Sequence, residues 1–167
     1  MTEEELMLPQ GLYAETFIVQ DSDIDVLEHV NNRVYLRWME TVATNHSAAR
    51  GYDWKKYLAM GSVWVAREHW IEYLRPCVLG DVVTVYSWVE AFDDTRCLRR
   101  YAMKKGGKLV CTAATEWDYI DFKTKRRASI PEPLQVAFQR IPDGDERLKA
   151  LGLARPLRYQ SDLVMKG

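Results

Sequence analysis

The chain has 167 residues, of which 47% are apolar and 28% are charged, as expected for one soluble globular domain with a proper core. Its net charge of −1 gives no basis for binding nucleic acid or an anionic membrane. A small substrate or another protein surface is therefore the expected partner.

Several common motifs are absent from the sequence. The three cysteines, Cys77, Cys97 and Cys111, are odd in number and form no C-x-x-C pair, so neither a disulfide framework nor a zinc site is expected. The sequence contains no Walker loop, no G-x-G-x-x-G turn, no G-x-S-x-G elbow and no metal-ligand spacing, so we expect no cofactor and no metal. It also lacks a secretory signal and any apolar run long enough to span a membrane, which makes the cytoplasm the expected location.

The N-terminal part of the chain predicts a lead-in, a strand, a polar loop and a long helix. Residues 1–11 are expected to be a polar, mobile lead-in, and residues 12–20 are rich in β-forming side chains. An acidic loop follows and ends in two asparagines, which are preferred helix N-caps. The helix is expected to run to about residue 50, before Gly51, because apolar residues recur every four positions, at Val34, Trp38 and Val42. A second, short helical piece is expected within residues 52–60.

From residue 62 onward the apolar pattern has a period of two, which predicts strands. Four long strands are expected, at residues 63–74, 82–92, 95–104 and 109–122. An unbroken alternation along the first of these would place Trp64 and His69 on opposite faces. Short turns such as Gly106-Gly107 require antiparallel neighbours. The long helix needs an apolar surface, so we expect an α+β fold in which one antiparallel sheet of about five strands wraps around that helix.

Beyond the last strand the pattern weakens. Pro131 is expected to begin a short helix, and residues 141–167 read as an exposed polar tail without a clear period. We therefore expect one domain at residues 12–138 and a C-terminal extension at residues 139–167.

The loop before the long helix carries the residues that are best suited to chemistry. Asp25 and His29 lie immediately ahead of the helix mouth. A helix mouth has unpaired amide N–H groups and a partial positive charge, so it can hold a carbonyl oxygen that becomes negative. A carboxylate at this place can attack a carbonyl carbon or deprotonate a water molecule, although Asp25 can also be a simple loop or cap carboxylate.

Three motifs, in the same order, resemble those of the hotdog-fold acyl-thioesterases, the family that includes 4-hydroxybenzoyl-CoA thioesterase and the plant acyl-acyl-carrier-protein thioesterases. They are Asp23-Ile-Asp25-x-x-x-His29-Val-Asn31-Asn32-x-x-Tyr35-x-x-Trp38-x-Glu40, Ile71-Glu-Tyr73-Leu-Arg75-Pro76-x-x-x-Gly80-Asp81, and Asp121-x-x-Thr124 leading to Ile130-Pro131. The resemblance covers roughly residues 12 to 138. It departs from the family at two positions, because plant enzymes commonly have Asn where this chain has Leu27, and many bacterial enzymes have Gly where it has Glu28.

The resemblance implies the hotdog fold, and a homodimer or homotetramer in which sheets join edge to edge. The substrate would be an acyl-CoA or acyl-carrier-protein thioester, held in a groove between protomers with its carbonyl at the helix mouth. Asp25 would be nucleophile or general base, and His29 would assist by orienting substrate or water. Losing the plant Asn puts the water-positioning part of that mechanism in doubt, and losing Gly at position 28 raises the possibility of a different loop path.

The remaining candidate residues each have a structural alternative. Asn31 and Asn32 can cap the helix, contact the substrate, or do both, and Tyr35 and Trp38 are core residues first and acyl-groove lining second. Two further residues complete the expected substrate-binding set, and each also has a structural interpretation. Glu40 lies about 12 Å along the helix and suits a structural or interprotomer role. Arg126 belongs to the basic patch at residues 123–127, which is either a solvated turn or a contact for the phosphates of CoA or of a carrier protein's pantetheine arm.

The function expected from these residues is hydrolysis of a thioester to a free acid and a thiol. One rival is an acyl-CoA-binding protein of the same fold that does not hydrolyse its ligand, because a fold does not determine a function. A dehydratase acting on a β-hydroxyacyl thioester is a weaker rival, since its histidine would be expected in a Pro-rich loop rather than in Glu-His29-Val-Asn-Asn. The third rival is a structural or interaction role, which only the tail at residues 141–167 suggests.

Overall fold

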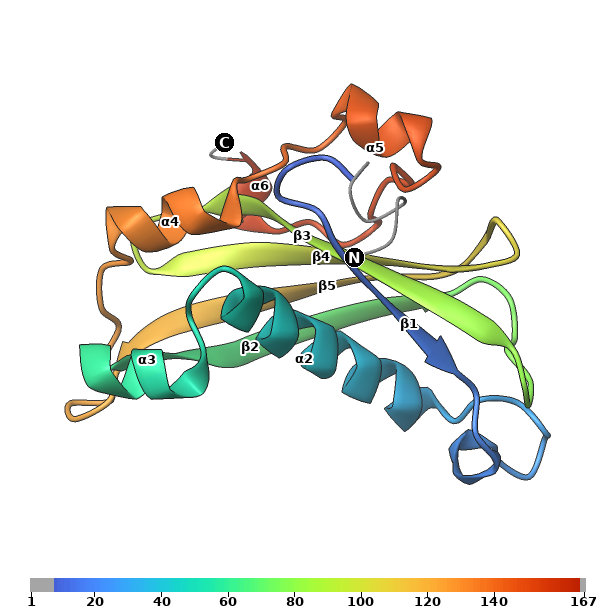
Figure 1. Cartoon of the computed structure of the whole chain (residues 1–167). Helices are drawn as coiled ribbons and strands as arrows, with labels where there is room; N and C mark the ends of the chain where they lie inside the picture. Colours follow the sequence, from blue (N-terminus) through green and yellow to red (C-terminus); the bar gives the residue numbers. More distant parts are fainter. Residues whose placement is uncertain (1–7, 166–167) are drawn as a thin grey trace.

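In the computed structural model, which describes residues 8–165, one antiparallel sheet curves around one long helix (Figure 1). The five strands pair in the order β1-β3-β4-β5-β2, so β1 and β2 are the two edges. Their bounds are β1 Tyr13–Ile18, β2 Ser62–Tyr73, β3 Val82–Phe92, β4 Arg96–Lys105 and β5 Lys108–Asp121. The α+β class and the five-stranded antiparallel sheet around a long helix are confirmed.

The central helix, α2 (Asn32–Ala49), lies in the concave face of the sheet (Figure 1). Its 18 residues give it a length of about 27 Å. The predicted apolar stripe is the buried face, where Val34, Trp38, Met39 and Val42 pack against inward-facing residues of the strands such as Tyr101. Burial of this stripe, rather than intrinsic helix propensity, holds α2 in place.

Shorter elements close both ends of this layer. A 3-10 turn, η1 (Asp21–Asp23), lies next to the N-terminal end of α2, and α3 (Trp54–Met60) follows its C-terminal end. The helix α4 (Glu132–Phe138) begins after Pro131, as predicted. No helix in the described part of the chain is long and apolar enough to cross a membrane.

One β-bulge in β2 corrects the predicted alternation. The pairing of β2 with β5 shifts register between Ala66 and Glu68, so one extra residue enters β2 at that point. As a result, Trp64 and Ile71 both contact residues on the concave side, although an unbroken period of two places them on opposite faces. His69 shares the face of Ile71, because the two lie two positions apart with no bulge between them. The prediction that Trp64 and His69 lie on opposite faces is therefore wrong.

The C-terminal segment is not an exposed polar tail. It crosses the convex face of the sheet and contains two short helices, α5 (Glu146–Ala150) and α6 (Asp162–Met165). Its irregularly spaced apolar side chains are buried against Trp88, Leu98 and neighbouring outward-facing residues, and they are Ile141, Leu148, Leu153 and Leu163. Because these residues follow no helical or strand period, the pattern in the sequence did not reveal them.

The expected lead-in at residues 1–11 is described only from residue 8 onward, and residues 1–7 lie outside the described part of the chain. Gly11 is buried, with φ at +90°, and a Cβ atom there would stand 2.0 Å from the backbone oxygen of Gln139. This close approach joins the entry of β1 to the segment that follows α4.

Gly11→Ala should therefore destabilise the fold by about 3 kcal/mol or more, because both a left-handed φ and a backbone clash oppose the new side chain. Gly51→Ala is the matched control, since its φ of +94° is nearly the same and nothing lies within 4 Å of its Cβ position. That variant should lose only about 1–2 kcal/mol. Urea unfolding of both variants measures the difference, and equal losses would contradict the close approach.

Candidate active site

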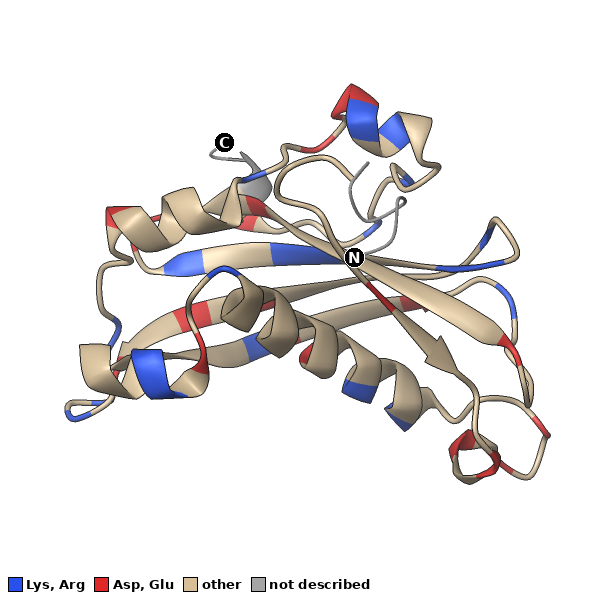
Figure 2. Ribbon diagram, in the orientation of Figure 1, with Lys and Arg blue, Asp and Glu red and all other residues tan. Residues whose placement is uncertain are grey.

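The loop between β1 and α2 is held in place by the buried carboxylate of Asp23. Asp23 Oδ2 accepts a hydrogen bond from the Gln20 amide at 2.9 Å, and Asp23 Oδ1 accepts one from Arg37 Nη2 at 2.7 Å. The Asp23 carbonyl oxygen accepts a third, from the Asn31 amide at 2.8 Å. Figure 2 shows the resulting arrangement, with acidic residues at η1 and basic residues on the first turns of α2. The start of the helix is thus tied to the turn that precedes it.

The protonation state of Asp23 follows from these contacts. Burial acts to raise the pKa of its carboxyl group, but the hydrogen bonds from Gln20 and Arg37 outweigh it, and the pKa lies below its ordinary value. Asp23 is therefore an anion at neutral pH.

Asp25 begins a tight turn that leads to His29. Asp25 Oδ1 accepts the Leu27 amide at 2.9 Å, the Asp25 amide donates to the His29 carbonyl at 2.9 Å, and Ile24 pairs with Val30 in an isolated β-bridge. This side-chain-to-backbone bond is an Asx turn, which fixes the Asp25 carboxylate relative to its loop. In the described part of the chain, no hydrogen bond engages Asp25 Oδ2.

The backbone at Glu28 adopts a conformation that a glycine would adopt easily. Its φ is +62°, in the left-handed region that favours glycine. The substitution of Glu for the Gly of many bacterial relatives therefore leaves a backbone of the glycine-compatible type, at a local cost of about 1 kcal/mol.

The mouth of α2 leaves one amide available. Asn31 is the N-cap, and its Oδ1 accepts the Arg33 amide at 3.0 Å, while the Val34 amide donates to the Asn31 carbonyl at 2.9 Å. Among residues 8–165, no acceptor is found for the backbone N–H of Asn32. This N–H belongs to the first turn, where the helix dipole adds positive potential.

An open cavity of about 410 Å³ lies at this helix mouth. Four of the predicted site residues line it together: Asp25, His29, Asn32 and Tyr35. The other lining residues come from the same loop and from the end of β2, and they are Leu27, Val30, Tyr73, Leu74, Arg75 and Pro76. Burial raises the pKa of the Tyr35 phenol, so this hydroxyl stays neutral at physiological pH.

The other predicted residues lie elsewhere in a single chain. Asn31 caps the helix, and Trp38 is buried in the core between Phe17 and Tyr35. Glu40 is exposed on α2 and is not among the residues that line the cavity at the helix mouth, and Arg126 lies in the turn after β5, next to the N-terminal end of β2. His69 is exposed, and its Nδ1 lies 2.8 Å from Thr115 Oγ1.

Two lining residues, Tyr73 and Arg75, were quoted in the sequence motif but not singled out as site residues. The signal that could have identified them is their position, because Tyr73 is the last residue of β2 and Arg75 follows it by two residues. Among the described residues, no three His, Cys, Asp or Glu side chains gather in a way that could hold a metal ion. The groups present at this mouth are a carboxylate, an imidazole, a phenol and a backbone amide without an acceptor among the described residues.

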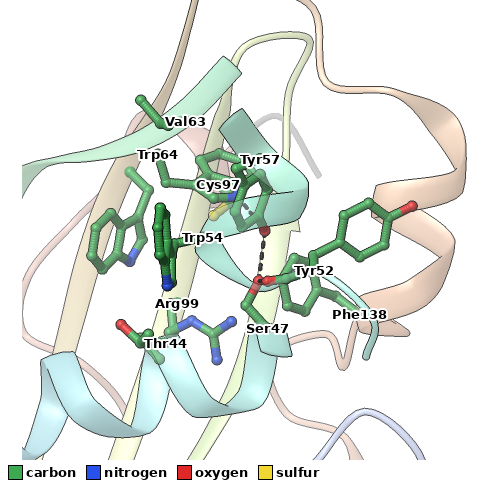
Figure 3. A pocket seen from close by; sticks show the side chains of 12 residues that line it. Thr44, Ser47, Tyr52, Trp54, Tyr57, Val63, Trp64, Cys97, Arg99 and Phe138 are labelled. Carbon is green, nitrogen blue, oxygen red and sulfur yellow. Dashed lines mark hydrogen bonds between the residues drawn. The ribbon is translucent and has the colours of Figure 1, made fainter. Parts of the chain in front are cut away.

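A second cavity, of about 220 Å³, lies at the opposite end of α2 (Figure 3). It is lined mainly by aromatic side chains of α3, β2, β5 and α4, and by Arg99 of β4. The sequence analysis did not identify it. The available signal was one cation, Arg99, at an inward position of a strand that otherwise alternates Cys97, Tyr101 and Met103 toward the core.

Comparison with known proteins identifies a family that matches most of the chain. Residues 19–138 match the Thioesterase-like superfamily. Among proteins of curated function, none matches the chain.

Three solved structures illustrate the shared fold. A hypothetical protein of Staphylococcus aureus, solved in complex with CoA, has 20% identity and a TM-score of 0.72, with 95% of this chain and 94% of that chain covered. A 1,4-dihydroxy-2-naphthoyl-CoA thioesterase from Synechocystis has 17% identity and a TM-score of 0.70, with 76% and 95% covered. The DHNA-CoA thioesterase of Staphylococcus aureus has 16% identity and a TM-score of 0.70, with 84% and 93% covered. At these identities the likeness shows the fold alone.

The anchoring of the loop can be tested through Asp23→Asn, which should lower the free energy of unfolding at pH 7 by about 2 kcal/mol, because it weakens two hydrogen bonds to a buried anion. Since the folded pKa is depressed, this contribution is fully present above the unfolded value of about 3.9 and is lost as pH falls through the lower folded value. Urea unfolding at pH 7 and at pH 3 measures the gap. The exposed Asp21→Asn is the control, and a gap that persists unchanged in acid would refute the charged anchor.

Proposed function

The chain belongs to the thioesterase-like superfamily, and from that premise we propose that it hydrolyses an acyl-CoA or acyl-carrier-protein thioester at the cavity beside Asp25. The observation that carries this proposal is the juxtaposition of a carboxylate with a free oxygen and a helix mouth with a free amide, on one open cavity. Thioester hydrolysis requires both a group that attacks or activates water and a group that stabilises the oxyanion.

Asp25 is the attacking or activating group. Its Oδ1 is held by the Leu27 amide, so the free Oδ2 faces its target in a fixed orientation. As general base, Asp25 takes a proton from water while the water oxygen attacks the thioester carbon, and the proton then passes to the departing thiolate. As nucleophile, Asp25 attacks the thioester carbon, the C–S bond breaks and the thiolate leaves, which gives an acyl-enzyme anhydride. Water then hydrolyses the anhydride to the free acid and regenerates the Asp25 carboxylate, and a proton released from that water converts the thiolate to the thiol. His29, exposed on the same cavity, orients the water or the leaving sulfur.

The oxyanion is stabilised by the amide of Asn32. This N–H points from the first turn of α2, where it adds to the positive end of the helix dipole. Asn31 acts indirectly, because its side chain fixes the geometry of that turn. A contact of this kind contributes about 10²–10³ in rate when it is aimed at the developing charge.

A homodimer formed through β2 would complete the site. The strand β2 is a long free edge of the sheet, and Val65 on it is 49% exposed. Large apolar residues beside this edge are also exposed, including Trp54, Leu58 and Tyr73. Pairing β2 with a second copy satisfies the unpaired edge and buries these side chains.

Antiparallel pairing of β2 with itself accounts for Arg126. The two ends of β2 then meet, so the Ser62 end of one chain lies beside the Tyr73 end of the other. Because the turn that carries Arg126 adjoins the Ser62 end, Arg126 of the partner subunit lies near the cavity of Asp25. Together with Arg75 in the cavity, it supplies positive charge for the phosphates of CoA or of a pantetheine arm. The CoA complex of the Staphylococcus aureus relative supports CoA as the carrier.

The alternative function, acyl-CoA binding without hydrolysis, is favoured by one observation. Leu27 lines the cavity where the plant enzymes have an asparagine that positions water, and a leucine cannot hydrogen-bond a water molecule. Release of free thiol from an acyl-CoA distinguishes the two functions, because a pure binder retains its ligand intact.

Asp25→Asn should lower kcat on an acyl-CoA at least a hundredfold, because the amide neither attacks nor deprotonates water. The fold should persist, since Asn can still accept the Leu27 amide and form the Asx turn. Thiol release over a panel of aliphatic and aromatic acyl-CoA esters measures the effect. Glu28→Gln is the control, since Glu28 is exposed in the same loop and does not line the cavity. Parental activity in Asp25→Asn would remove Asp25 from the mechanism.

Val65→Lys should weaken the proposed dimer at least tenfold, because it replaces an apolar contact at the β2 edge with a charge. Analytical ultracentrifugation at several protein concentrations measures the dissociation constant. Val136→Lys, on the exposed surface of α4, should leave it unchanged. If both variants assemble like the parent, the dimer uses another surface.

A further inference from the structure

The second cavity lies at the end of α2 that is farthest from Asp25. Asn32 and Ser47 are separated by fifteen residues, which is about 22 Å along the helix, so the two cavities are distinct within one chain. Its walls are rings, as Figure 3 shows for those labelled, and they come from Tyr52, Trp54, Tyr57, Trp64, Trp117 and Phe138. Its volume of about 220 Å³ lies below the range of about 300–1,000 Å³ that drug-sized ligands require, so it suits a ligand of one or two rings.

Most polar groups of this cavity already have partners. Trp64 Nε1 donates to the Tyr57 hydroxyl at 3.0 Å, and that hydroxyl lies 2.6 Å from Ser47 Oγ, which donates to the Tyr52 carbonyl at 2.7 Å (Figure 3). Burial raises the pKa of the Tyr57 phenol to about 12, so the hydroxyl is neutral. This chain of hydrogen bonds is therefore closed and uncharged.

Among the described residues that line this cavity, Arg99 alone carries a charge. Its side chain enters the cavity from β4, and the residue is only 4% exposed. Nη1 donates to His46 Nδ1 at 2.8 Å and to Ser87 Oγ at 3.0 Å, and the guanidinium carbon lies 5.2 Å from the centre of the Phe138 ring. A guanidinium has five N–H donors, and in the part of the chain described here Nε and Nη2 have no hydrogen-bond acceptor.

The neighbouring histidine does not balance this charge. Burial, together with the guanidinium groups of Arg99 and Arg50, lowers the pKa of His46 to about 2, so the ring is neutral. Since Nδ1 accepts from Arg99, the ring proton is on Nε2, and the 3.4 Å contact of Nε2 with Arg50 Nε is not a hydrogen bond. Among the described residues, no carboxylate lies within ion-pair distance of Arg99.

The next residue of the same strand shows how the chain treats a buried arginine when no ligand is involved. Arg100 points to the convex face, is 2% exposed, and pairs with the equally buried Glu90 at 2.7 Å. A buried charge is costly unless a counter-charge and hydrogen bonds compensate it. Arg99 is therefore a buried cation for which the described residues provide no carboxylate partner.

We propose that this cavity is a binding site for a small aromatic carboxylate, whose carboxylate group pairs with Arg99 and whose ring packs among the surrounding aromatic side chains. A carboxylate provides the acceptors that Nε and Nη2 lack, in the bidentate geometry that suits a guanidinium. The ring fits the cavity through edge-to-face and offset contacts with tryptophan and tyrosine.

The aromatic carboxylate that would pair with Arg99 can come from two sources. One is a free aromatic acid. The other is a carboxylate at the far end of an acyl group, and this case rests on the proposed function. In the proposed dimer, the Val63–Trp64 end of β2, which lines this cavity, lies beside the Tyr73 end of the partner and thus near its thioester site. Binding of the free acid is measured without any hydrolysis, so failure of the thioesterase proposal would leave that test intact.

The test is to titrate the full-length protein with benzoate and 2-naphthoate and with their primary amides, which have the same shape without the charge. Tryptophan fluorescence reports binding, because Trp54, Trp64 and Trp117 line the cavity, and calorimetry gives the dissociation constants. Each acid should bind at least tenfold more tightly than its amide, as expected of a charge-assisted bidentate pair. Equal affinities of acid and amide, or no binding of either, would overturn the proposal even if no variant can be prepared.

Variants then assign the effect to Arg99. Arg99→Met should abolish the preference for the acid over the amide, and Arg99→Lys should retain part of it. Arg50→Gln is the matched control, because Arg50 also lies against His46 but does not line the cavity, and its preference should match that of the parent. Circular dichroism and thermal unfolding check that each variant folds. If the preference for the acid over the amide survives Arg99→Met, or if Asp25→Asn removes it, the acid binds elsewhere.

The second source is tested with aryl-CoA esters that carry a distal carboxylate or a distal amide. If the cavity receives the acyl group, the parent should show a lower KM for the carboxylate ester than for the amide ester, and Arg99→Met should remove that difference. If only the free acid binds, the two esters should have the same KM in the parent and in the variant, which assigns the cavity to a free aromatic acid.

Discussion

The structure depends on where α2 begins. The helix is drawn into the concave face of the sheet by its apolar stripe, but its axial position is set by one buried carboxylate, that of Asp23. Asp23 bonds backward to Gln20, forward to Arg37 and, through its carbonyl, to Asn31, so the loop folds back and the first turn of α2 opens toward solvent. This constraint positions two groups of the candidate site, because Asp25 and His29 lie within the loop that it closes.

Much of this arrangement was available from the sequence. The strands, the long helix, the cap at Asn31 and the meeting of Asp25 with His29 follow from local rules, namely apolar periods, capping residues and turn chemistry. The bulge in β2 was missed because it depends on pairing with β5, which no local pattern encodes. The C-terminal segment was missed because its buried residues are spaced by contacts with the sheet rather than by any period.

Of the two cavities, sequence reasoning identified residues of only one. Asp25, His29, Asn32 and Tyr35 do line one cavity, whereas Trp38 is a core residue and Glu40 is solvent-exposed. Arg126 lies at the far end of the chain's own sheet, so whether it reaches substrate depends on a second copy, and such symmetry cannot be deduced from one sequence. The aromatic cavity with Arg99 was invisible for a related reason. Its walls come from segments that are distant in sequence, and its distinctive feature is an arginine for which the described residues provide no counter-charge.

The two faces of the sheet treat charge in opposite ways, and this contrast links fold to function. On the convex face, arginines and carboxylates pair with one another, as in the buried pair of Arg100 with Glu90 and the more exposed pair of Arg155 with Glu72, and hold the C-terminal segment in place. On the concave face, the free amide of Asn32, the free oxygen of Asp25 and the guanidinium of Arg99 remain available to something outside the chain.

The central claim is that Asp25 meets a thioester carbonyl at the mouth of α2. The most direct measurement is a crystal structure with a non-hydrolysable acyl-CoA analogue in which a methylene group separates the carbonyl from the sulfur. The account predicts that the carbonyl oxygen accepts a hydrogen bond from the Asn32 amide and that Asp25 Oδ2 faces the carbonyl carbon, directly or through one water. A ligand whose carbonyl lies away from the helix mouth, or an Asp25 carboxylate turned from it, would contradict the account.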